Sequence, residues 1–277
     1  MRWVIGDVHG MLKQLTALVG EVRKRDADAH FIFVGDYVNR GPDSKGVINF
    51  LLDLKHAKFV RGNHDDVFDL ILNDHWLAGE KGSFDPIAAC FWFLDHGLDR
   101  TLMSYGVEYA TIEIERERRT KKLLDLAREA VPKTHKRFIN KLPMTISDQH
   151  FFVSHAWWPP ETDNAPGTID ARLHDSAFRH RVLWHRWQVR EITDPKAWGR
   201  PAYFGHTPVM NYLPPFREED DLSPVTGPKI TLIDTGCVMD KDGRLTAVCV
   251  DHAATIQVDR LGKLVAPKAP TKSSGPT

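Results

Sequence analysis

The sequence predicts an α/β layered fold whose functional loops lie at the ends of strands. Three times within the first 77 residues, a short apolar segment is followed by a loop and then by a segment with helical periodicity. The same alternation of apolar segments and polar loops resumes after residue 149. Repeated units of this kind are typical of layered α/β proteins, in which ligands bind at the carboxyl ends of strands.

The N-terminal elements follow from apolar periodicity and from the residues between them. The predicted strands are RWVI (2–5), HFIFV (30–34) and the start of AKFVRGNHD (57–65), and the predicted helices cover 11–24, 44–55 and about 65–77. Ser44 is the expected N-cap of the second helix, because a hydroxyl at that position can accept a hydrogen bond from a free backbone N–H group.

The middle of the chain, about residues 80–143, predicts a helical insertion at the edge of the sheet. The segments DPIAACFWFLDHG and RERRTKKLLDLAREAVPKTHKRFINKL have helical character, and the second is highly charged. Neither contributes enough apolar residues for an independent core. We therefore expect a single domain over residues 1–264 that includes the insertion.

The α/β pattern resumes in QHFFVSHAWW and continues through AYFGHTP. KITLIDTG and RLTAVCVD predict a closing pair of strands around a Gly-Asp turn, and ATIQVD predicts a third strand. The tail at 265–277 is rich in proline, serine and lysine and is expected to be disordered.

Composition excludes several classes of function. The chain has 277 residues, 42% of them hydrophobic, and 37 basic residues balance 37 acidic ones, so no net field favours nucleic acid or an anionic membrane. The N-terminus lacks a long apolar segment, and no apolar stretch of 18 residues occurs. Three scattered cysteines, Cys90, Cys237 and Cys249, form no disulfide framework. We expect a cytoplasmic protein without nucleic-acid or membrane partners.

Five loops combine oxygen and imidazole ligands, and each follows an apolar strand. They are GDVHG with Asp7 and His9; GDYVNRG with Asp36, Asn39 and Arg40; RGNHD with Arg61, Asn63, His64 and Asp65; VSHA with His155; and FGHTP with His206. Carboxylates and imidazoles without thiolates suit manganese, iron or zinc, and one aspartate can bridge two such ions. An adjacent arginine supplies paired donors for phosphate oxygens. The pattern predicts metal-assisted hydrolysis of a phosphate ester or anhydride.

These motifs resemble the calcineurin-like metallophosphoesterases, specifically the phosphoprotein phosphatases in their bacterial and phage-like form. The resemblance runs from residue 4 to about residue 250 and is least determined in the helical insertion. It implies a four-layer αββα sandwich of two mixed sheets flanked by helices. It also implies two divalent metal ions, manganese first, with iron or zinc as alternatives.

The resemblance assigns a role to each residue of the site. It implies that one metal is held by Asp7, His9 and Asp36, and the other by Asp36, Asn63, His155 and His206. Asp36 would bridge the ions, and a metal-bound hydroxide would be the nucleophile. Arg40 and Asn63 would contact the phosphate, and His64 would be the general acid. Arg186, in LWHRW, stands where phage-type relatives carry a second phosphate-binding arginine.

Two positions depart from the family pattern. Where the family has small residues shortly after the histidine, this chain has Trp157 and Trp158. Two interpretations are open. The rings would form an aromatic wall that contacts a base or an apolar side chain of the substrate, or they would belong to the core or to a lid. Asn39 replaces the aspartate that most relatives place beside the catalytic histidine. An amide could still orient the ring by accepting a hydrogen bond, and relatives that cleave symmetrical dinucleoside tetraphosphates can lack the aspartate.

The remaining polar residues of the motifs have simpler expectations. Arg61 is expected to brace its loop, and Asp65 to complement the dipole of the helix that follows. The expected function is a phosphatase for phosphomonoesters, chiefly phosphoserine and phosphothreonine in proteins, with phosphotyrosine or nucleotides as further substrates, so that its partner is a phosphorylated protein or a small phosphoester. The alternatives are a symmetrical dinucleoside tetraphosphate hydrolase and an inactive phosphate-binding scaffold. The scaffold is disfavoured because every implied metal ligand is present.

Overall fold

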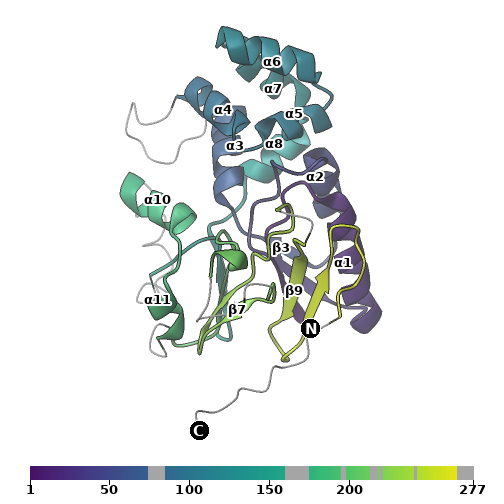
Figure 1. The fold of residues 1–277 in the computed structure, drawn as a ribbon, viewed down its shortest axis with the longest axis vertical. Coiled ribbons are helices and arrows are strands. Elements are labelled where there is room, and N and C mark those ends of the chain that lie inside the picture. The colour runs from purple at the N-terminus through teal and green to yellow at the C-terminus, as the bar shows by residue number, and fades with distance from the viewer. Residues whose placement is uncertain are drawn as a thin grey trace.

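A computed structural model describes residues 1–73, 85–159, 175–194, 198–212, 218, 221–239 and 242–266. Two five-stranded sheets form the lower part of the molecule, and a group of helices forms the upper end (Figure 1). None of the described helices is long and apolar enough to cross a membrane.

The first sheet carries the N-terminal loops to one edge. Its strands lie in the order β10 (Thr255–Val258), β9 (Leu245–Cys249), β1 (Arg2–Ile5), β2 (His30–Phe33) and β3 (Ala57–Phe59). The strands β1, β2 and β3 are parallel, and Phe33 is level with Ile5 on one side and with Phe59 on the other. The loops after these three strands therefore leave the sheet at the same level.

The second sheet has a parallel centre as well. Its order is β4 (Thr145–Ser147), β5 (Phe152–Ser154), β6 (Ala202–Phe204), β8 (Ile230–Leu232) and β7 (Val225–Thr226). The strands β5, β6 and β8 are parallel to one another. The outer strands β4 and β7 pair antiparallel here, as β9 and β10 do in the first sheet, so both sheets are mixed, as expected.

Alternation along the strands separates the layers. Val4 and Ile32 of the first sheet pack with Val153 and Tyr203 of the second in an apolar layer between the sheets. The residues next to them in sequence, such as Ile5, point instead to the helices. Because successive strand residues face opposite sides, each sheet buries both faces, and the four-layer αββα sandwich is confirmed.

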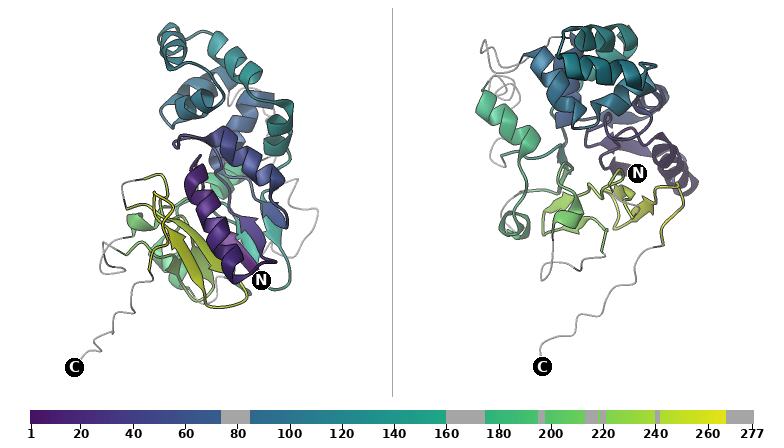
Figure 2. Two further views of the ribbon diagram at one scale, coloured as in Figure 1. Left: turned by 90° about the vertical axis from the view of Figure 1, so that its right-hand side faces the viewer. Right: turned by 45° about the horizontal axis from the view of Figure 1, so that its top comes forward.

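Two helices cover the outer face of the first sheet, as Figure 2 shows for α1. They are α1 (Leu12–Arg25) and α2 (Ser44–Asp53). The prediction that Ser44 caps α2 is wrong. The cap is Asp43, whose carboxylate accepts a hydrogen bond from the Gly46 backbone N–H at 2.7 Å. Ser44 turns its hydroxyl to Asn39 and Thr101 instead.

The predicted helical region contains five described helices rather than two. They are α4 (Pro86–Leu94), α5 (Leu98–Ser104), α6 (Tyr109–Arg118), α7 (Lys122–Ala130) and α8 (Lys133–Asn140). The long charged segment is interrupted before α8, where Pro132 occupies the N-cap position and cannot continue a helix from α7. Buried side chains of these helices, such as Phe93 and Leu102, join the core above the first sheet.

The C-terminal strands correct another prediction. KITLIDTG and RLTAVCVD do not form a pair, because β8 lies in the second sheet and β9 in the first. After β8 the chain crosses from the second sheet to the first, where β9 pairs with β1 and with β10. Helices α10 (Ser176–Trp184) and α11 (Val189–Thr193) belong to the outer side of the second sheet.

Some predicted segments lie partly outside the described residues. The third helix, α3 (Asn63–Asn73), begins within the RGNHD motif, and positions 74–77 of the prediction are not described. The same holds for residues 80–84 of the insertion and for all of the predicted tail except 265 and 266.

Candidate metal centre

The five polar loops meet at one edge of the two sheets. Asp7 and His9 follow β1; Asp36, Asn39 and Arg40 follow β2; Asn63 and His64 begin α3 after β3; His155 follows β5; and His206 follows β6. The loops from both sheets converge because the parallel strands end at the same level. Apart from Arg40, all of these side chains are buried.

The backbone of this region is strained. Seven non-glycine residues of the described chain have positive φ angles, and five of them belong to these loops: His9, Asp36, Asn39, Arg40 and His206. A left-handed conformation is unfavourable for residues with a Cβ atom and persists where the surroundings enforce it. The strain therefore gathers at the same place as the candidate ligands.

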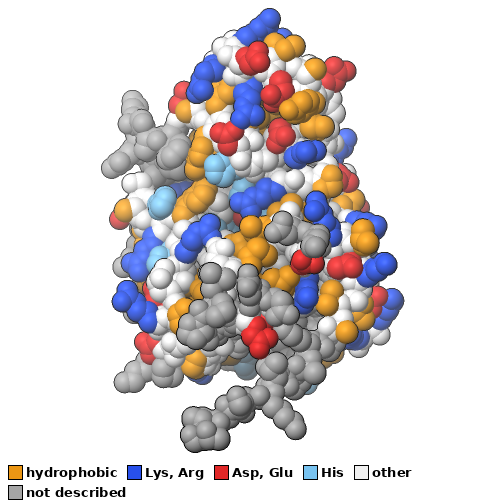
Figure 3. Space-filling view, in the orientation of Figure 1, with side chains coloured by type: hydrophobic (Ala, Val, Ile, Leu, Met, Phe, Trp, Pro, Cys, Tyr) orange, Lys and Arg blue, Asp and Glu red, His pale blue; other side chains and the backbone are white. Residues whose placement is uncertain are grey.

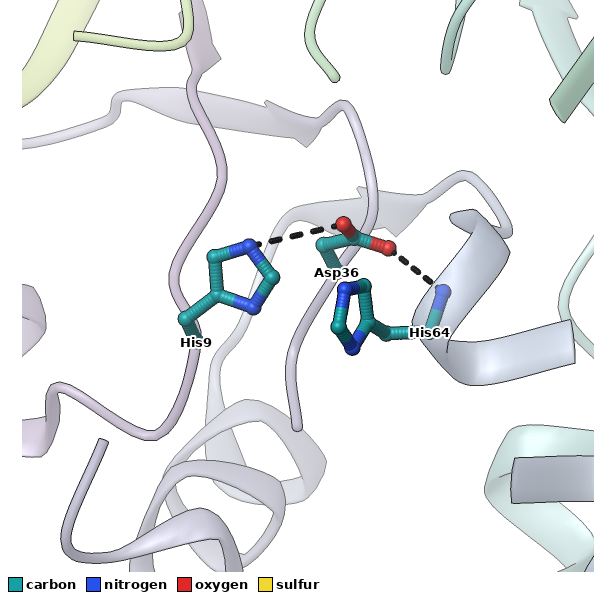
Figure 4. A group of neighbouring side chains, drawn as sticks. All are labelled: His9, Asp36 and His64. Carbon is teal, nitrogen blue, oxygen red and sulfur yellow. Dashed lines mark hydrogen bonds and ion pairs between the residues drawn. The ribbon is translucent and has the colours of Figure 1, made fainter. Parts of the chain in front are cut away.

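Asp36 lies at the centre of the group. Its Oδ2 is 3.5 Å from His9 Nε2, and its Oδ1 is 3.5 Å from His155 Nε2. The Oδ1 atom also accepts a hydrogen bond from the His64 backbone N–H at 2.9 Å, which fixes the carboxylate (Figure 4). One carboxylate thus faces an imidazole from each sheet.

Asn63 and Asp7 complete the group on either side. Asn63 Oδ1 is 2.9 Å from His155 Nε2 and 3.0 Å from His206 Nδ1. The Asp7 carboxylate accepts a hydrogen bond from the His206 backbone N–H at 3.0 Å. The six predicted metal ligands are therefore brought together.

The donor atoms fit bound cations. His9 Nδ1 and His155 Nδ1 donate to the backbone carbonyls of Val38 and Val34 at 3.0 and 2.9 Å, so each ring in its neutral form exposes a lone pair on Nε2. Burial keeps the rings neutral, because it lowers the pKa of His9 well below its ordinary value and the pKa of His155 to about 4. The lone pair of His155 then faces the carbonyl oxygen of Asn63 at 2.9 Å, and a cation held by both atoms would remove the repulsion between these two acceptors.

The carboxylates point to the same conclusion. Burial raises the pKa of Asp36 to about 7, and burial together with the charges of Asp234 and Asp36 raises the pKa of Asp7 well above its ordinary value. The buried carboxylates of Asp7, Asp36 and Asp234 repel one another, and divalent cations would offset this repulsion. Asp234 was missed in the sequence, although LIDTG shows the same pattern of an apolar strand followed by aspartate and glycine.

Two glycines of the motifs are required by close packing. A Cβ atom on Gly62 would overlap the Asp36 carboxylate, and one on Gly205 would overlap the Asp7 carboxylate. The glycines before Asn63 and His206 therefore let the two loops approach the acidic ligands.

Asn39 contacts His64, but not in the expected direction. Its amide Nδ2 donates to His64 Nδ1 at 3.0 Å, while its Oδ1 accepts a hydrogen bond from the Thr101 hydroxyl at 2.8 Å. The expectation that the amide accepts from the ring is therefore wrong, because Thr101 of α5 already occupies the carbonyl. With Nδ1 as an acceptor, the neutral ring carries its proton on Nε2.

The basic residues lie around the mouth of the centre. Arg40 and Arg186 are exposed, and histidine and basic side chains gather at mid-height on the face shown in Figure 3. The charge of Arg40 acts to lower the pKa of Asp36, and the charge of Arg186 acts to lower that of His206. Both guanidinium charges are therefore felt at the candidate centre.

Arg61 and Asp65 support the loops. Arg61 is buried and donates to Asp69 at 2.8 Å and to backbone carbonyls in the last turn of α8, so it braces the loop as expected. Asp65 does more than complement the helix dipole. Its carboxylate accepts backbone N–H groups of Asp36, Tyr37 and Gly62 at 2.8 to 3.0 Å and so holds the Asp36 loop.

Of the two interpretations left open for Trp157 and Trp158, the structure supports the core. Both are buried in the apolar cluster on the outer side of the second sheet, and Trp158 is fully inaccessible. A different tryptophan, Trp184, lies beside the centre, with its ring centroid 6.0 Å from that of His206.

Comparison with known families gives one long match. Residues 2–209 match the calcineurin-like phosphoesterase family. Over 244 residues, the chain is 25% identical to serine/threonine-protein phosphatase 1 of Salmonella typhimurium, covering 88% of this chain and 89% of that protein.

Other relatives match over a shorter length. A symmetrical bis(5'-nucleosyl)-tetraphosphatase of Coxiella burnetii is 41% identical over 63 residues, which is 23% of this chain and 22% of that protein. The chain thus spans about a fifth of the length of this relative.

Two solved structures share the fold. One, a proposed diadenosine tetraphosphatase, has a TM-score of 0.53 at 20% identity and covers 93% of this chain and 92% of its own. The other, a cold-active protein tyrosine phosphatase, has a TM-score of 0.51 at 15% identity and covers 95% and 77%. At such identities the likeness concerns the fold alone.

Proposed function

The chain belongs to the calcineurin-like phosphoesterase family, and from this premise we propose that it hydrolyses phosphomonoesters, chiefly phosphoserine and phosphothreonine in proteins. One observation carries the proposal. The Asp36 carboxylate lies 3.5 Å from an imidazole of each sheet, where a bridging ligand of two metal ions would stand.

The proposed metal ligands divide into two sets that share Asp36. One metal is assigned to Asp7, His9 and Asp36, and the other to Asp36, Asn63, His155 and His206. We propose manganese, although the same donor set suits iron or zinc. When bound, two divalent ions would activate water and withdraw charge from the phosphoryl oxygens.

The protein's own residues would bind and protonate the substrate. Arg40 and Arg186 are exposed beside the centre and can offer paired N–H groups to phosphoryl oxygens. Asn63 turns its carbonyl to the imidazoles, which leaves its amide N–H groups for the phosphate. His64, as the imidazolium, would donate its Nε2 proton to the leaving oxygen and return to the neutral ring, in which Nδ1 accepts from Asn39.

Support for a protein substrate comes from the relative of similar length, the Salmonella serine/threonine phosphatase. A second candidate is symmetrical hydrolysis of dinucleoside tetraphosphates. It is favoured by Asn39, because an uncharged partner that donates to Nδ1 disfavours the imidazolium form of His64. A nucleotide leaving an anhydride needs that proton less than a serine alkoxide does.

The test is a substrate screen on the manganese-loaded protein. Phosphoserine and phosphothreonine peptides, diadenosine tetraphosphate and p-nitrophenyl phosphate are compared by kcat/KM, with bound metal measured by elemental analysis and Asp36→Asn as the inactive control. A higher kcat/KM for the peptides supports the first candidate. Preferred conversion of the tetraphosphate to two ADP molecules supports the second, and phosphate binding without turnover of any substrate supports a scaffold.

A further inference from the structure

Three aromatic rings form a stack between two helices that are distant in sequence. Trp92 of α4 and Trp184 of α10 have ring centroids 5.6 Å apart and an interplanar angle of 27°. His180, one turn before Trp184, lies nearly parallel to it at 6.1 Å and 13°. The stack joins α10 to the helical end of the molecule, where Figure 1 shows α4.

This ring stack lies beside the metal centre. The Trp184 ring is 6.0 Å from the ring of the proposed ligand His206. On the other side, Trp92 is 5.2 Å from His96, whose ring is 6.4 Å from that of His64. A molecule whose phosphate occupied the centre would therefore have these rings next to it.

A cavity of about 480 Å³ adjoins the stack between α3, α4 and α10. Its wall includes Trp92, His180, Trp184, Val67, Leu70 and Leu183. This volume lies within the range of about 300–1,000 Å³ that is usual for small-molecule sites.

The cavity carries little net charge at its wall. Its two charged residues, Asp66 and Arg179, form a buried ion pair with each other, and Asp66 also accepts a hydrogen bond from Arg61. The polar side chains Ser176 and His180 stand on the α10 side. The wall thus suits a planar, uncharged ring with heteroatoms at its edge.

Trp92 offers surface to an incoming ring. It is 37% exposed, which is unusual for so large an apolar side chain beside a buried centre. Planar rings stack favourably on an exposed aromatic face, and every nucleobase is such a planar ring.

We propose that the ring stack and its cavity bind the base of a nucleoside whose phosphate enters the metal centre. This adds nucleoside monophosphates to the phosphoprotein substrates of the first candidate and rests on the proposed phosphatase function. A nucleobase fits better than the phenyl ring of a tyrosine, because the cavity is larger than one such ring needs and Ser176 and His180 can pair with ring heteroatoms.

The first test measures binding without catalysis. Adenosine, which has no phosphate, is titrated into the full-length protein by calorimetry, with ribose as the ringless comparison. We expect saturable binding of adenosine but not of ribose, and about tenfold weaker binding in Trp92→Ala, as for the loss of one base–aromatic stack. Equal behaviour of adenosine and ribose, or unchanged binding in Trp92→Ala, would overturn the proposal.

A matched pair of variants separates occupancy of the cavity from general damage. Ala177→Leu adds a side chain at the cavity wall on α10, whereas Ala88→Leu makes the same change at an exposed position of α4 away from the cavity. Adenosine binding should fall about tenfold in the first variant and remain at the parental value in the second. Weaker adenosine binding in Ala88→Leu with parental binding in Ala177→Leu would contradict the location of the base in this cavity.

Measurements of activity then distinguish the nucleoside site from the proposed phosphatase function. The ratio of kcat/KM for adenosine 5′-monophosphate to that for glycerol phosphate should fall about tenfold in Ala177→Leu and stay constant in Ala88→Leu. A constant ratio in both variants would overturn the nucleoside site. If the parent binds adenosine but hydrolyses neither these two esters nor phosphoserine and phosphothreonine peptides, the proposed function fails while the ring site stands.

Discussion

Asn39→Asp would reverse the direction of one hydrogen bond at His64. In the protein the amide donates to His64 Nδ1 over 3.0 Å, and Thr101 holds the amide in this orientation. Burial, followed by the charges of His9 and Arg40, lowers the pKa of His64 well below its ordinary value. An aspartate would retain the bond from Thr101 and present an accepting oxygen to the ring, which favours the protonated imidazolium.

The size of the shift in the pKa of His64 follows from the short distance between its ring and the side chain at position 39. An opposite charge within about 4–6 Å raises the pKa of an imidazole by about 1–3 pH units, which corresponds to about 1.4–4 kcal/mol. The sign is upward, because the charged form gains a partner. If His64 must be protonated to act, the alkaline limb of the pH profile should move upward by the same amount.

The assay compares two leaving groups over a range of pH. For a phosphoserine peptide, whose alkoxide needs a proton, Asn39→Asp should raise kcat/KM near neutral pH and move the alkaline limb upward. For p-nitrophenyl phosphate, whose leaving group departs without a proton, the gain should be smaller. Asn39→Leu, which removes the bond without adding charge, is the control. Equal effects on both substrates with no movement of the limb would refute the reasoning.

Four further substitutions test the centre and its support. Asp36→Asn should abolish most turnover and reduce bound metal in elemental analysis; near-normal turnover with two tightly bound ions would exclude the two-metal assignment. Arg40→Lys should lower kcat/KM at unchanged metal content, because lysine cannot form the paired bonds, and an unchanged kcat/KM would remove Arg40 from the phosphate site. Arg186→Ala should weaken inhibition by inorganic phosphate, and an unaltered inhibition constant would show that it makes no such contact. Arg179→Met should lower the free energy of unfolding, measured in urea, by about 2–4 kcal/mol. This is somewhat less than for an isolated buried pair, because Asp66 would retain its ion pair with Arg61. A loss below about 0.5 kcal/mol would show that the Arg179–Asp66 pair contributes little.

The residues that meet at the candidate centre could be predicted because each lies in a loop, or at the start of a helix, that follows a strand. Apolar segments such as HFIFV locate the strands, and parallel strands bring their carboxyl ends together. The side chains that support the ligands could not be predicted in this way. Thr101 lies on α5, 62 positions from Asn39, and nothing in its neighbourhood indicates that its hydroxyl reaches the loop.

Tertiary packing decided what local sequence left open or predicted wrongly. Trp157 and Trp158 come two and three positions after His155, and the sequence left both a site role and a core role open. The apolar cluster on the outer side of the second sheet, which includes residues of α10, buries both rings. The closing strands appear consecutive in sequence, but each finds its neighbour in a different sheet. Local sequence patterns identify elements, whereas the choice of partner depends on residues elsewhere in the chain.

The centre is built from both sheets, and this makes the apolar layer between them part of the site. Asp36 and Asn63 come from the first sheet, and His155 and His206 come from the second. The distances of 2.9 to 3.5 Å between their donor atoms are therefore set by how closely the sheets pack, through side chains such as Val4 and Val153. Close-packed interiors resist compression and transmit displacement. A bridging ligand must hold two ions at a fixed separation, so the rigidity of this layer, as much as the identity of the ligands, determines whether the centre can act.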